Sequence, residues 1–388
     1  MPGKKIKVCH LITSFWTGHG PSSGILVQLQ NHDSREFAFS ICSLYAPSQA
    51  RDPRDLLKTA GMDYQVLPMG PSFLDVRVLG PLVLYLRRIQ PNILHCHLVR
   101  ANLYGPIAAR LAGIKAVVCS IRGIDEYVTG CDPISRAVRL AERGTAAWVS
   151  RYVAVSETAR RAIIKHLRLS PGKITTILNA VDLSPFQRPP CNRAALRAEL
   201  GLAPEALVVG SVGNLLPLKN YASLVRWCAE IAPHFPGLQL LISGEGQERQ
   251  ALESLIGALQ LTGKVRLLGF RTDIPAVLGL MDIFAFPSLS EGLPRAVMEA
   301  MAAGLPCVVM DVGGNAEAVV DGETGFVVPL GDGEQFKRAL SRLLQNAALR
   351  KKMGAAGKKR AFALFNPKRL AAQYTDLYRS LLPPDPRL

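Results

Sequence analysis

Residues 282–310, DIFAFPSLSEGLPRAVMEAMAAGLPCVVM, predict a short hydrophobic strand, a turn, a helix and a second strand. The run DIFAFPS is apolar and is followed by the turn residues LSEGL. Pro294 suits the first position of a helix, because its missing N–H would have no partner there. PCVVM then returns to a strand. Strand, helix and strand in this order predict a parallel sheet covered by helices.

The same alternation extends along the whole chain, in two series. The first contains the runs KIKVCHLIT, FAFSICSLY, NILHCH, KAVVCS, RYVAVS and KITTIL; the second contains ALVVGSVG, LQLLISG, KVRLLG, DIFAFPS, PCVVM and GFVVP. Between them, the proline-rich stretch at 181–192 is the best linker candidate. We therefore expect two doubly wound, Rossmann-like α/β domains facing a central cleft, over residues 1–185 and 186–364. We expect a C-terminal helix within residues 365–388, and we consider an arrangement in which this helix packs back on the N-terminal domain.

Composition places the chain among globular proteins. It has 388 residues, of which 48% are hydrophobic and 20% charged, and this length favours two domains. No apolar run approaches the roughly 18 residues needed to cross a bilayer. The first residues, MPGKKIKVCHLITSF, begin like a signal peptide, but His10 and Thr13 interrupt the apolar run and no cleavage site follows. We expect a first strand here, and a cytoplasmic protein.

The eight cysteines lack metal or redox spacing. No two of them are separated by two residues, so we expect ordinary buried thiols. His95 and His97 share a face of a predicted strand, but two ligands without an acidic or cysteine partner are too few for a metal site. No Asp-x-Asp triplet occurs either, so we expect neither a metal nor another cofactor.

The net charge of +16 is unevenly distributed. Residues 1–185 hold 23 Lys and Arg against 12 Asp and Glu. Such a domain suits an anionic partner, whether nucleic acid, an acidic membrane face or a phosphorylated substrate, although a solvated basic surface is an equally good interpretation. Nucleic acid ranks lowest, because the chain has no recognisable motif for it.

Glu291 and Glu299 are two carboxylates in an apolar stretch. Glu291 precedes the predicted helix, and Glu299 lies about a turn and a half inside it. A carboxylate beside the N–H groups of a helix start can bind a phosphorylated sugar, since carboxylates accept hydrogen bonds from hydroxyls and N–H groups donate to phosphate. Alternatively, Glu291 caps the helix and Glu299 pairs with Arg295.

A second candidate loop opens the same domain. VVGSVGNLLPLKN places Gly213 and Asn214 after a strand and Lys219 where the next helix begins. A lysine near a helix start beside glycine-permitted backbone is a candidate phosphate contact. The glycine and Lys-Ser/Thr spacing of a P-loop is absent.

The first domain offers weaker motifs. TGHGPSSG places Gly18, Gly20 and Gly24 after the first strand, but the second strand ends without an acidic residue, so we do not expect a nicotinamide site. CSIRGIDEY presents Arg122 and Asp125 at the end of a later strand, where a cation could meet a substrate anion; Arg122 could equally be a surface side chain.

Together these stretches resemble the retaining family 4 glycosyltransferases, which have the GT-B fold. SEGLPRAVMEAMAAGLPCVV carries the two glutamates with seven residues between them. VGNLLPLKN, LISGEGQER, VRLLGF, GGNAEAVVDGETGFVVP, VAVSE and ILNAVD continue the likeness in the family's order. It covers nearly the whole chain and is weaker in the first domain.

The resemblance implies roles for individual residues. Lys219 would hold the donor diphosphate, and Glu291 the donor sugar and the distal phosphate. Asn214 replaces the arginine usual beside this lysine, and Arg122 lies where many members carry a histidine near the reacting sugar. The other implied contacts are Gly292, Leu293 and Pro294 (donor sugar and distal phosphate), Glu299 (ribose), Gly20 (phosphate), Phe270 and Arg271 (base), and Gly244 and Glu245 (nucleotide).

The resemblance implies transfer of a sugar from a nucleotide diphosphate sugar, without a metal and with the anomeric configuration retained. The expected acceptor is a glycan or a lipid-linked intermediate, and the basic first domain suits peripheral association with an anionic membrane. A GT-B epimerase of sugar nucleotides and a non-catalytic subunit that binds them are the alternatives.

Overall fold

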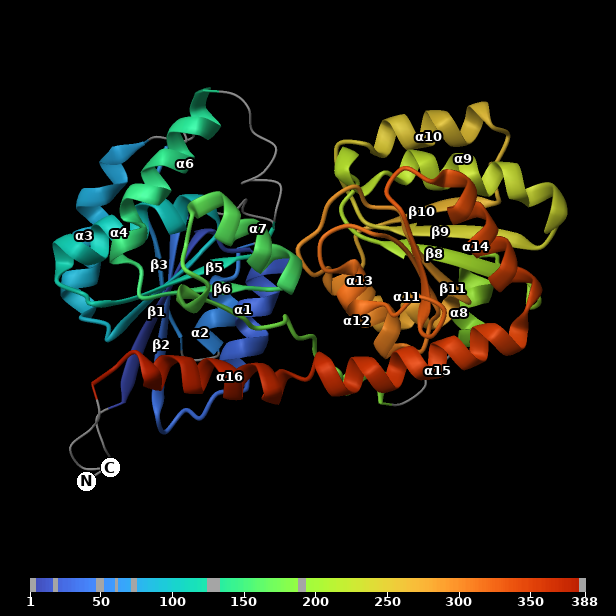
Figure 1. Cartoon of the computed structure of the whole chain (residues 1–388). Helices are drawn as coiled ribbons and strands as arrows, with labels where there is room; N and C mark the ends of the chain where they lie inside the picture. The colour runs from blue at the N-terminus through green and yellow to red at the C-terminus, as the bar shows by residue number, and fades with distance from the viewer. Residues whose placement is uncertain are drawn as a thin grey trace. The chain divides into compact units, whose positions relative to one another are not determined.

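The computed structural model describes residues 5–16, 20–46, 52–59, 62–70, 75–123, 133–187 and 193–383. The chain divides into two compact units (Figure 1). Unit 1 comprises residues 1–180 and 367–388, and unit 2 comprises residues 181–366. The first segment of unit 1 ends at Ala180, whereas we expected the boundary at residue 185. The last helix also belongs to unit 1.

Unit 1 is built on a seven-stranded sheet in the order β3-β2-β1-β4-β5-β6-β7, in which each described pair of neighbours is parallel. This is the order of a doubly wound fold, whose ligands bind at the carboxyl ends of the strands. The strands are β1 (Ile6–Ser14), β2 (Phe37–Tyr45), β3 (Asp63–Val66), β4 (Ile93–His97), β5 (Ala116–Ile121), β6 (Arg151–Ala154) and β7 (Ile174–Thr176). Six of them coincide with predicted runs; β3 was not predicted.

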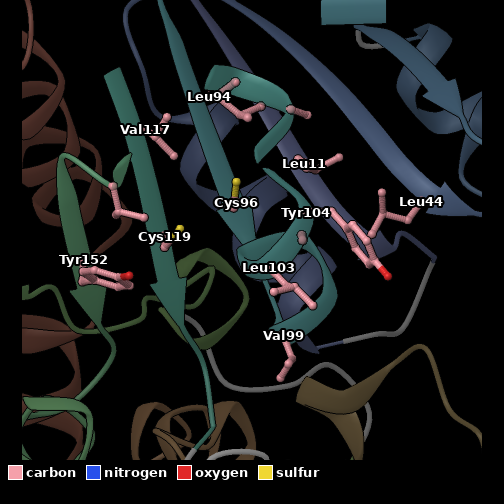
Figure 2. Close-up of a cluster of buried hydrophobic side chains, with 14 of the residues drawn as sticks. Leu11, Leu44, Leu94, Cys96, Val99, Leu103, Tyr104, Val117, Cys119 and Tyr152 are labelled. Atoms are coloured by element: carbon pink, nitrogen blue, oxygen red, sulfur yellow. The ribbon is translucent and has the colours of Figure 1, made fainter. Parts of the chain in front are cut away.

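Helices cover both faces of this sheet. One face carries α3 (Leu79–Ile89), α4 (Val99–Ala112), α6 (Pro133–Thr145) and α7 (Glu157–Leu167); the other carries α1 (Gly20–Gln30), α2 (Arg54–Thr59) and α16 (Pro367–Ser380). Figure 2 shows side chains of α4 and of five strands meeting in the first of these cores. Gly105 allows close packing here, because a Cβ on it would lie 2.2 Å from Cys96 Sγ.

Unit 2 repeats the architecture with a six-stranded parallel sheet in the order β10-β9-β8-β11-β12-β13. All six strands were predicted. They are β8 (Leu207–Val212), β9 (Leu238–Ser243), β10 (Val265–Gly269), β11 (Ile283–Phe286), β12 (Cys307–Met310) and β13 (Gly325–Val328). The helices are α8 (Arg193–Glu199), α9 (Tyr221–Ile231), α10 (Arg249–Ala258), α11 (Ile274–Leu280), α12 (Arg295–Ala302), α13 (Asn315–Ala318), α14 (Gly333–Gln345) and α15 (Ala347–Leu364).

The C-terminal helix α16 completes the core of unit 1. Leu370, Tyr374, Leu377 and Tyr378 are buried against Val8, Ile93, Val118 and Val153 of the sheet and against Val27 of α1. Burial of these apolar side chains stabilises unit 1 by the hydrophobic effect. The sheet therefore has an apolar cover that comes from the far end of the sequence.

Two further expectations concern the whole chain. The six cysteines within the described residues are free and buried, as predicted, and Cys131 and Cys191 lie outside that part. Among the described helices, none combines the length and the apolar composition needed to cross a bilayer.

Candidate functional site

The carboxyl end of the unit 2 sheet brings Lys219 and Glu291 together. Lys219 ends the short helical turn Pro217–Lys219 after β8, and Glu291 lies in the loop between β11 and α12. Lys219 Nζ lies 2.5 Å from Glu291 Oε1, and both side chains are mostly buried. The Ser288 hydroxyl donates to the same carboxylate oxygen at 2.6 Å. The ammonium also lies 5.0 Å from the centre of the Phe286 ring, within the range of a cation–π contact.

Glycines let the surrounding backbone segments approach one another closely. A Cβ on Gly244, whose φ is +152°, would lie 1.9 Å from Gly213 O and 3.5 Å from Asn214 N. A Cβ on Gly313, whose φ is +54°, would lie 1.8 Å from Glu291 O. Only glycine fits such approaches without displacing the neighbouring chain. The loops carrying Asn214, Gly244 and Glu291 are thereby held at the same edge of the sheet.

The Glu291 segment does not cap the following helix. Pro294, with φ −74° and ψ 126°, is the N-cap residue of α12 and has no side-chain capping bond, so it lies one position earlier than predicted. Gly292 O accepts a hydrogen bond of 2.6 Å from Gly314 N, which joins this loop to the start of α13. Gly292, Leu293 and Pro294 are buried beside the carboxylate. The capping alternative for Glu291 is therefore wrong.

Glu299 forms an ion pair with Arg295, as one of the two interpretations of the sequence predicted. Its Oε1 lies 2.7 Å from Arg295 Nε, one helical turn away. Glu299 is only 7% exposed, whereas the Arg295 side chain is 43% exposed. Burial raises the pKa of Glu299 above its ordinary value, and Arg295 opposes this rise. An ion pair with Arg295 leaves acceptor capacity on the carboxylate, so it does not exclude a ribose contact.

The predicted nucleotide contacts surround the ends of β9 and β10. Glu245 O accepts from Leu215 N at 2.9 Å, and Gly244 N donates to Gly269 O at 2.9 Å. The Glu245 carboxylate pairs with Arg249 at 2.5 Å. Phe270 is 50% exposed, as a base-stacking residue would be, and Arg271 pairs with Asp273 at 2.6 Å. These side chains come after the carboxyl ends of β9 and β10, at the same edge of the sheet as Lys219 after β8.

In unit 1, Arg122 lies at the carboxyl end of β5. Its Nε and Nη2 atoms lie 3.3 and 3.2 Å from His97 Nδ1, and its Nη1 lies 3.4 Å from Asn179 Oδ1. Gly20 begins α1, whose later residue Gly24 faces the guanidinium, because a Cβ there would lie 2.9 Å from Arg122 Nη1. Arg122 is thus held between two elements and is not a free surface side chain. Gly18 and Asp125 lie outside the described residues.

Three buried histidines lie behind Arg122. β1 pairs with β4, which sets His10 opposite His95, and the ligand atoms of His10, His95 and His97 lie within 4.8 Å of one another. The sequence suggested two ligands; the neighbouring strand supplies the third. Burial lowers the pKa of all three, for His10 to about 3, so the imidazoles are neutral at physiological pH.

Hydrogen bonds occupy the lone pairs of this histidine cluster. Arg122 can only donate, so His97 Nδ1 accepts and His97 Nε2–H donates to His10 Nδ1 at 2.9 Å. Tyr378 accepts from Gln28 at 2.8 Å and donates to His95 Nδ1 at 2.7 Å, which leaves His95 Nε2–H to donate to Ser120 Oγ at 2.7 Å. In this arrangement the acceptor nitrogen of each imidazole is used, and His10 Nε2–H is left as a buried donor without a hydrogen-bond partner among the described residues. The nearby guanidinium also disfavours a cation. These residues do not fit a metal.

Some contacts could not be expected from the motifs. Ser288 and Phe286 contact the Lys219–Glu291 pair, and Asn179 binds Arg122. Ser288 could have been noticed as a hydroxyl three residues before Glu291 and two residues after a buried strand. Asn179 carries no local signal, because its relation to Arg122 depends on how separate elements of unit 1 pack.

Comparison with known proteins decides the family. The model of the glycosyl transferases group 1 matches residues 192–360, and that of glycosyltransferase family 4 matches residues 39–185. The chain belongs to this glycosyltransferase family. The two matched segments lie in unit 2 and unit 1 respectively.

Curated relatives include enzymes that build glycans. An Escherichia coli UDP-Gal:alpha-D-GlcNAc-diphosphoundecaprenol alpha-1,3-galactosyltransferase is 33% identical over 65% of this chain and 66% of its own length. The Rhizobium meliloti lipopolysaccharide core biosynthesis glycosyltransferase LpsE is 31% identical over 47% of this chain and 53% of its own. The aligned segments thus span about half to two thirds of these relatives.

Solved structures show the fold. Anabaena HepE in complex with UDP superposes with a TM-score of 0.82 at 21% identity, covering 96% of this chain and 100% of HepE. A sucrose-phosphate synthase from Thermosynechococcus elongatus gives 0.80 at 19% identity, covering 97% and 99%. The glycosyltransferase therefore has the expected GT-B fold, with two Rossmann-like units.

Proposed function

We propose that this glycosyltransferase moves a sugar from a nucleotide diphosphate sugar to a glycan or lipid-linked acceptor, with the anomeric configuration retained. The observation that carries the proposal is the Lys219–Glu291 pair at the carboxyl edge of the unit 2 sheet. The cation is placed to bind a diphosphate and the carboxylate to accept hydrogen bonds from sugar hydroxyls. The names of the relatives, which include a UDP-galactose-dependent transferase, support this donor class.

The leaving diphosphate accumulates negative charge as the glycosidic bond breaks. Lys219 stabilises that charge in a fixed position, because Glu291 and Phe286 hold the ammonium before substrate arrives. The N–H groups in the first turn of α12 have no intrahelical partner and add to the same field. Asn214 would contribute an amide to this region. The proposed chemistry requires no metal or other cofactor.

The other residues of the site would hold the donor. Glu291, with the backbone of Gly292, Leu293 and Pro294, would bind the donor sugar, and Glu299 would bind the ribose. Phe270 and Arg271 would contact the base, with Gly244 and Glu245 beside the nucleotide and Gly20 beside a phosphate. Retention by attack on the same face, with the departing phosphate oxygen accepting the acceptor's proton, uses no carboxylate nucleophile.

The deciding experiment incubates the enzyme with UDP-, GDP- and ADP-sugars, with and without candidate acceptors. Donors are first ranked by the rise in melting temperature, because a ligand of the folded state stabilises it. Release of nucleotide diphosphate only when acceptor is present supports transfer. Release without acceptor, as an epimerase would show, or binding without any product, as a non-catalytic subunit would show, contradicts it.

We further propose that unit 1 binds peripherally to the cytoplasmic face of an anionic membrane. Helices α3, α4 and α6 would make this contact. From Leu79 to Gly123 the chain has six Arg and Lys and no Asp or Glu. Leu84 of α3, Leu111 of α4 and Leu140 of α6 are exposed by 68%, 54% and 69%. These helices pack side by side (Figure 1).

Hollows at the end of this helical layer suit lipid headgroups. One of about 530 Å³ is lined by Arg87 and Lys115, and an adjoining one of about 310 Å³ is lined by Arg110, Lys115 and Trp148. Exposed apolar side chains beside basic ones are typical of surfaces that bind anionic bilayers. The basic composition of this surface and the lipid-linked acceptor named for one relative support the proposal.

A further inference from the structure

Arg122 carries a cation whose polar partners among the described residues are all neutral. The hydrogen bonds of its guanidinium go to His97 Nδ1 and Asn179 Oδ1, and no described carboxylate lies within salt-bridge distance. Other arginines of the same chain have carboxylate partners: Arg77 pairs with Asp75 at 2.7 Å and Arg271 with Asp273 at 2.6 Å. Arg122 is also less exposed than Arg77.

The neutrality of His97 is built into the fold. His97 is fully buried, and burial, together with the neighbouring His95 and Arg122, holds its pKa well below the ordinary value. In the tautomer whose Nδ1 accepts from the guanidinium, His97 Nε2–H donates to His10 Nδ1, so both ring nitrogens have a partner. The histidine cluster therefore orients Arg122 without cancelling its charge.

The other neighbours among the described residues add no negative charge. Gly24 of α1 lies directly against Nη1, where any side chain would require the guanidinium to move. The first turn of α1 contains no acidic residue. A partly buried cation with these surroundings is unfavourable by itself, and burial lowers the pKa of Arg122. A bound anion would relieve this cost.

We infer that Arg122 is an oxyanion-binding residue of unit 1, for a phosphate or carboxylate group of the substrate. The inference deepens the proposed function and rests on it for the nature of the substrate. Two sources supply this chemistry: the phosphate of a phosphorylated or diphosphate-linked acceptor, and the carboxylate of an acidic sugar. A bidentate guanidinium suits both groups, and a neutral sugar offers no such partner.

The test titrates inorganic pyrophosphate, and separately glucuronate, into the full chain by calorimetry. UDP is present at saturation to occupy the Lys219 site, and glucose is the neutral control. We compare the wild type with Arg122→Gln, with Arg122→Lys, which keeps the charge, and with Arg161→Gln, a matched exposed arginine of unit 1 on α7. UDP affinity is measured for each protein beforehand, and the titrations are repeated without UDP.

We expect Arg122→Gln to weaken anion binding by about tenfold or more, because the substitution removes a charge-assisted hydrogen bond to the anion. Arg161→Gln should bind as the wild type does, and UDP affinity should not change in either variant. Binding of pyrophosphate alone identifies a phosphate group, binding of glucuronate alone an acidic sugar, and binding of both the shared oxyanion chemistry. Without anion, Arg122→Gln should melt at or above the wild-type temperature.

Wild-type protein that binds neither anion, or Arg122→Gln protein that binds them unchanged, overturns the inference. So does a lower melting temperature of Arg122→Gln with unchanged anion binding, because the guanidinium would then be structural. If the chain fails to bind any nucleotide sugar but loses anion binding in Arg122→Gln, the proposed donor is wrong and the oxyanion site stands.

Discussion

Lys219 and Glu291, separated by 72 residues in sequence, form an ion pair of 2.5 Å with side chains only 17% and 10% exposed. The cation proposed to bind the diphosphate is thus partly neutralised before ligand arrives. A phosphate must share the ammonium with Glu291 or displace that carboxylate toward the sugar hydroxyls. The two residues therefore have coupled but different effects on binding and transfer.

Lys219→Ala should weaken UDP binding by about tenfold or more and lower turnover further, because it removes a charge-assisted contact to the diphosphate. It also leaves Glu291 without its cation, which should cost about 1–3 kcal/mol of stability. Calorimetry and kinetics measure the first effect and chemical denaturation the second. Lys337→Ala removes another ion-paired lysine of unit 2 and serves as control. Full activity of Lys219→Ala would exclude this lysine from the mechanism.

Glu291→Gln should separate binding from transfer. The amide keeps the shape and can still accept from Ser288, but it releases Lys219 from its ion pair, so UDP binding should be unchanged or tighter. Transfer should slow by about 10²-fold or more, the size expected when a transition-state contact is lost. Glu253→Gln, an exposed carboxylate paired with Arg249, is the control. Equal loss of UDP binding and transfer would contradict this division of roles.

Glu299 provides a test of pH dependence. Its pKa is raised by burial in the folded state, so ionisation disfavours folding: the stabilising contribution is present below the ordinary value of 4.5 and is lost as the pH rises above it. Glu299→Gln cannot ionise and should gain stability relative to wild type between pH 4 and pH 7, measured by denaturant titration. The opposite trend would show that Arg295 outweighs burial.

The same glutamate should affect nucleotide binding. Glu299→Ala should weaken binding of UDP because the ribose contact is lost, whereas Arg295→Ala should retain it while also breaking the ion pair. Titration calorimetry with UDP distinguishes the two. If both variants bind UDP normally, Glu299 has only the structural role of pairing with Arg295.

The proposed membrane-binding surface of unit 1 can be tested by reversing the charge of its basic side chains. Arg87→Glu with Arg110→Glu should reduce sedimentation with anionic vesicles, and wild-type binding should fall with added salt because the attraction is electrostatic. Lys351→Glu with Lys352→Glu makes the same change in net charge on exposed positions of unit 2 and should bind as wild type. Equal losses in both double variants, or no dependence on anionic lipid, would argue against this surface.

Tyr378→Phe should destabilise unit 1 by about 1–3 kcal/mol, because it leaves His95 Nδ1 and Gln28 Nε2 without a partner in a buried place. Tyr85→Phe, whose hydroxyl is only part-buried and donates a long hydrogen bond of 3.3 Å to Asp63, should have a smaller effect. Denaturant titrations of both variants check this order.

Most of the fold could be predicted because each sheet is parallel and buried, so its strands are continuous apolar runs such as LVVGSV and IFAF. β3 escaped prediction because DYQV is short and only partly buried. The pairing of Glu299 with Arg295 follows helical spacing. The pairing of Lys219 with Glu291 and the meeting of His10 with His95 could not be read locally, since strand order brings distant segments together.

The return of α16 to unit 1 sets an order of folding during synthesis. Unit 2 is one continuous stretch, residues 181–366, and all of it precedes α16 in translation. The sheet of unit 1 is translated first, but the part of its apolar face that α16 covers stays exposed until Leu370 to Tyr378 leave the ribosome. The N-terminal unit of this enzyme is thus the last to be completed. A nascent chain halted before α16 would expose apolar sheet surface that chaperones bind.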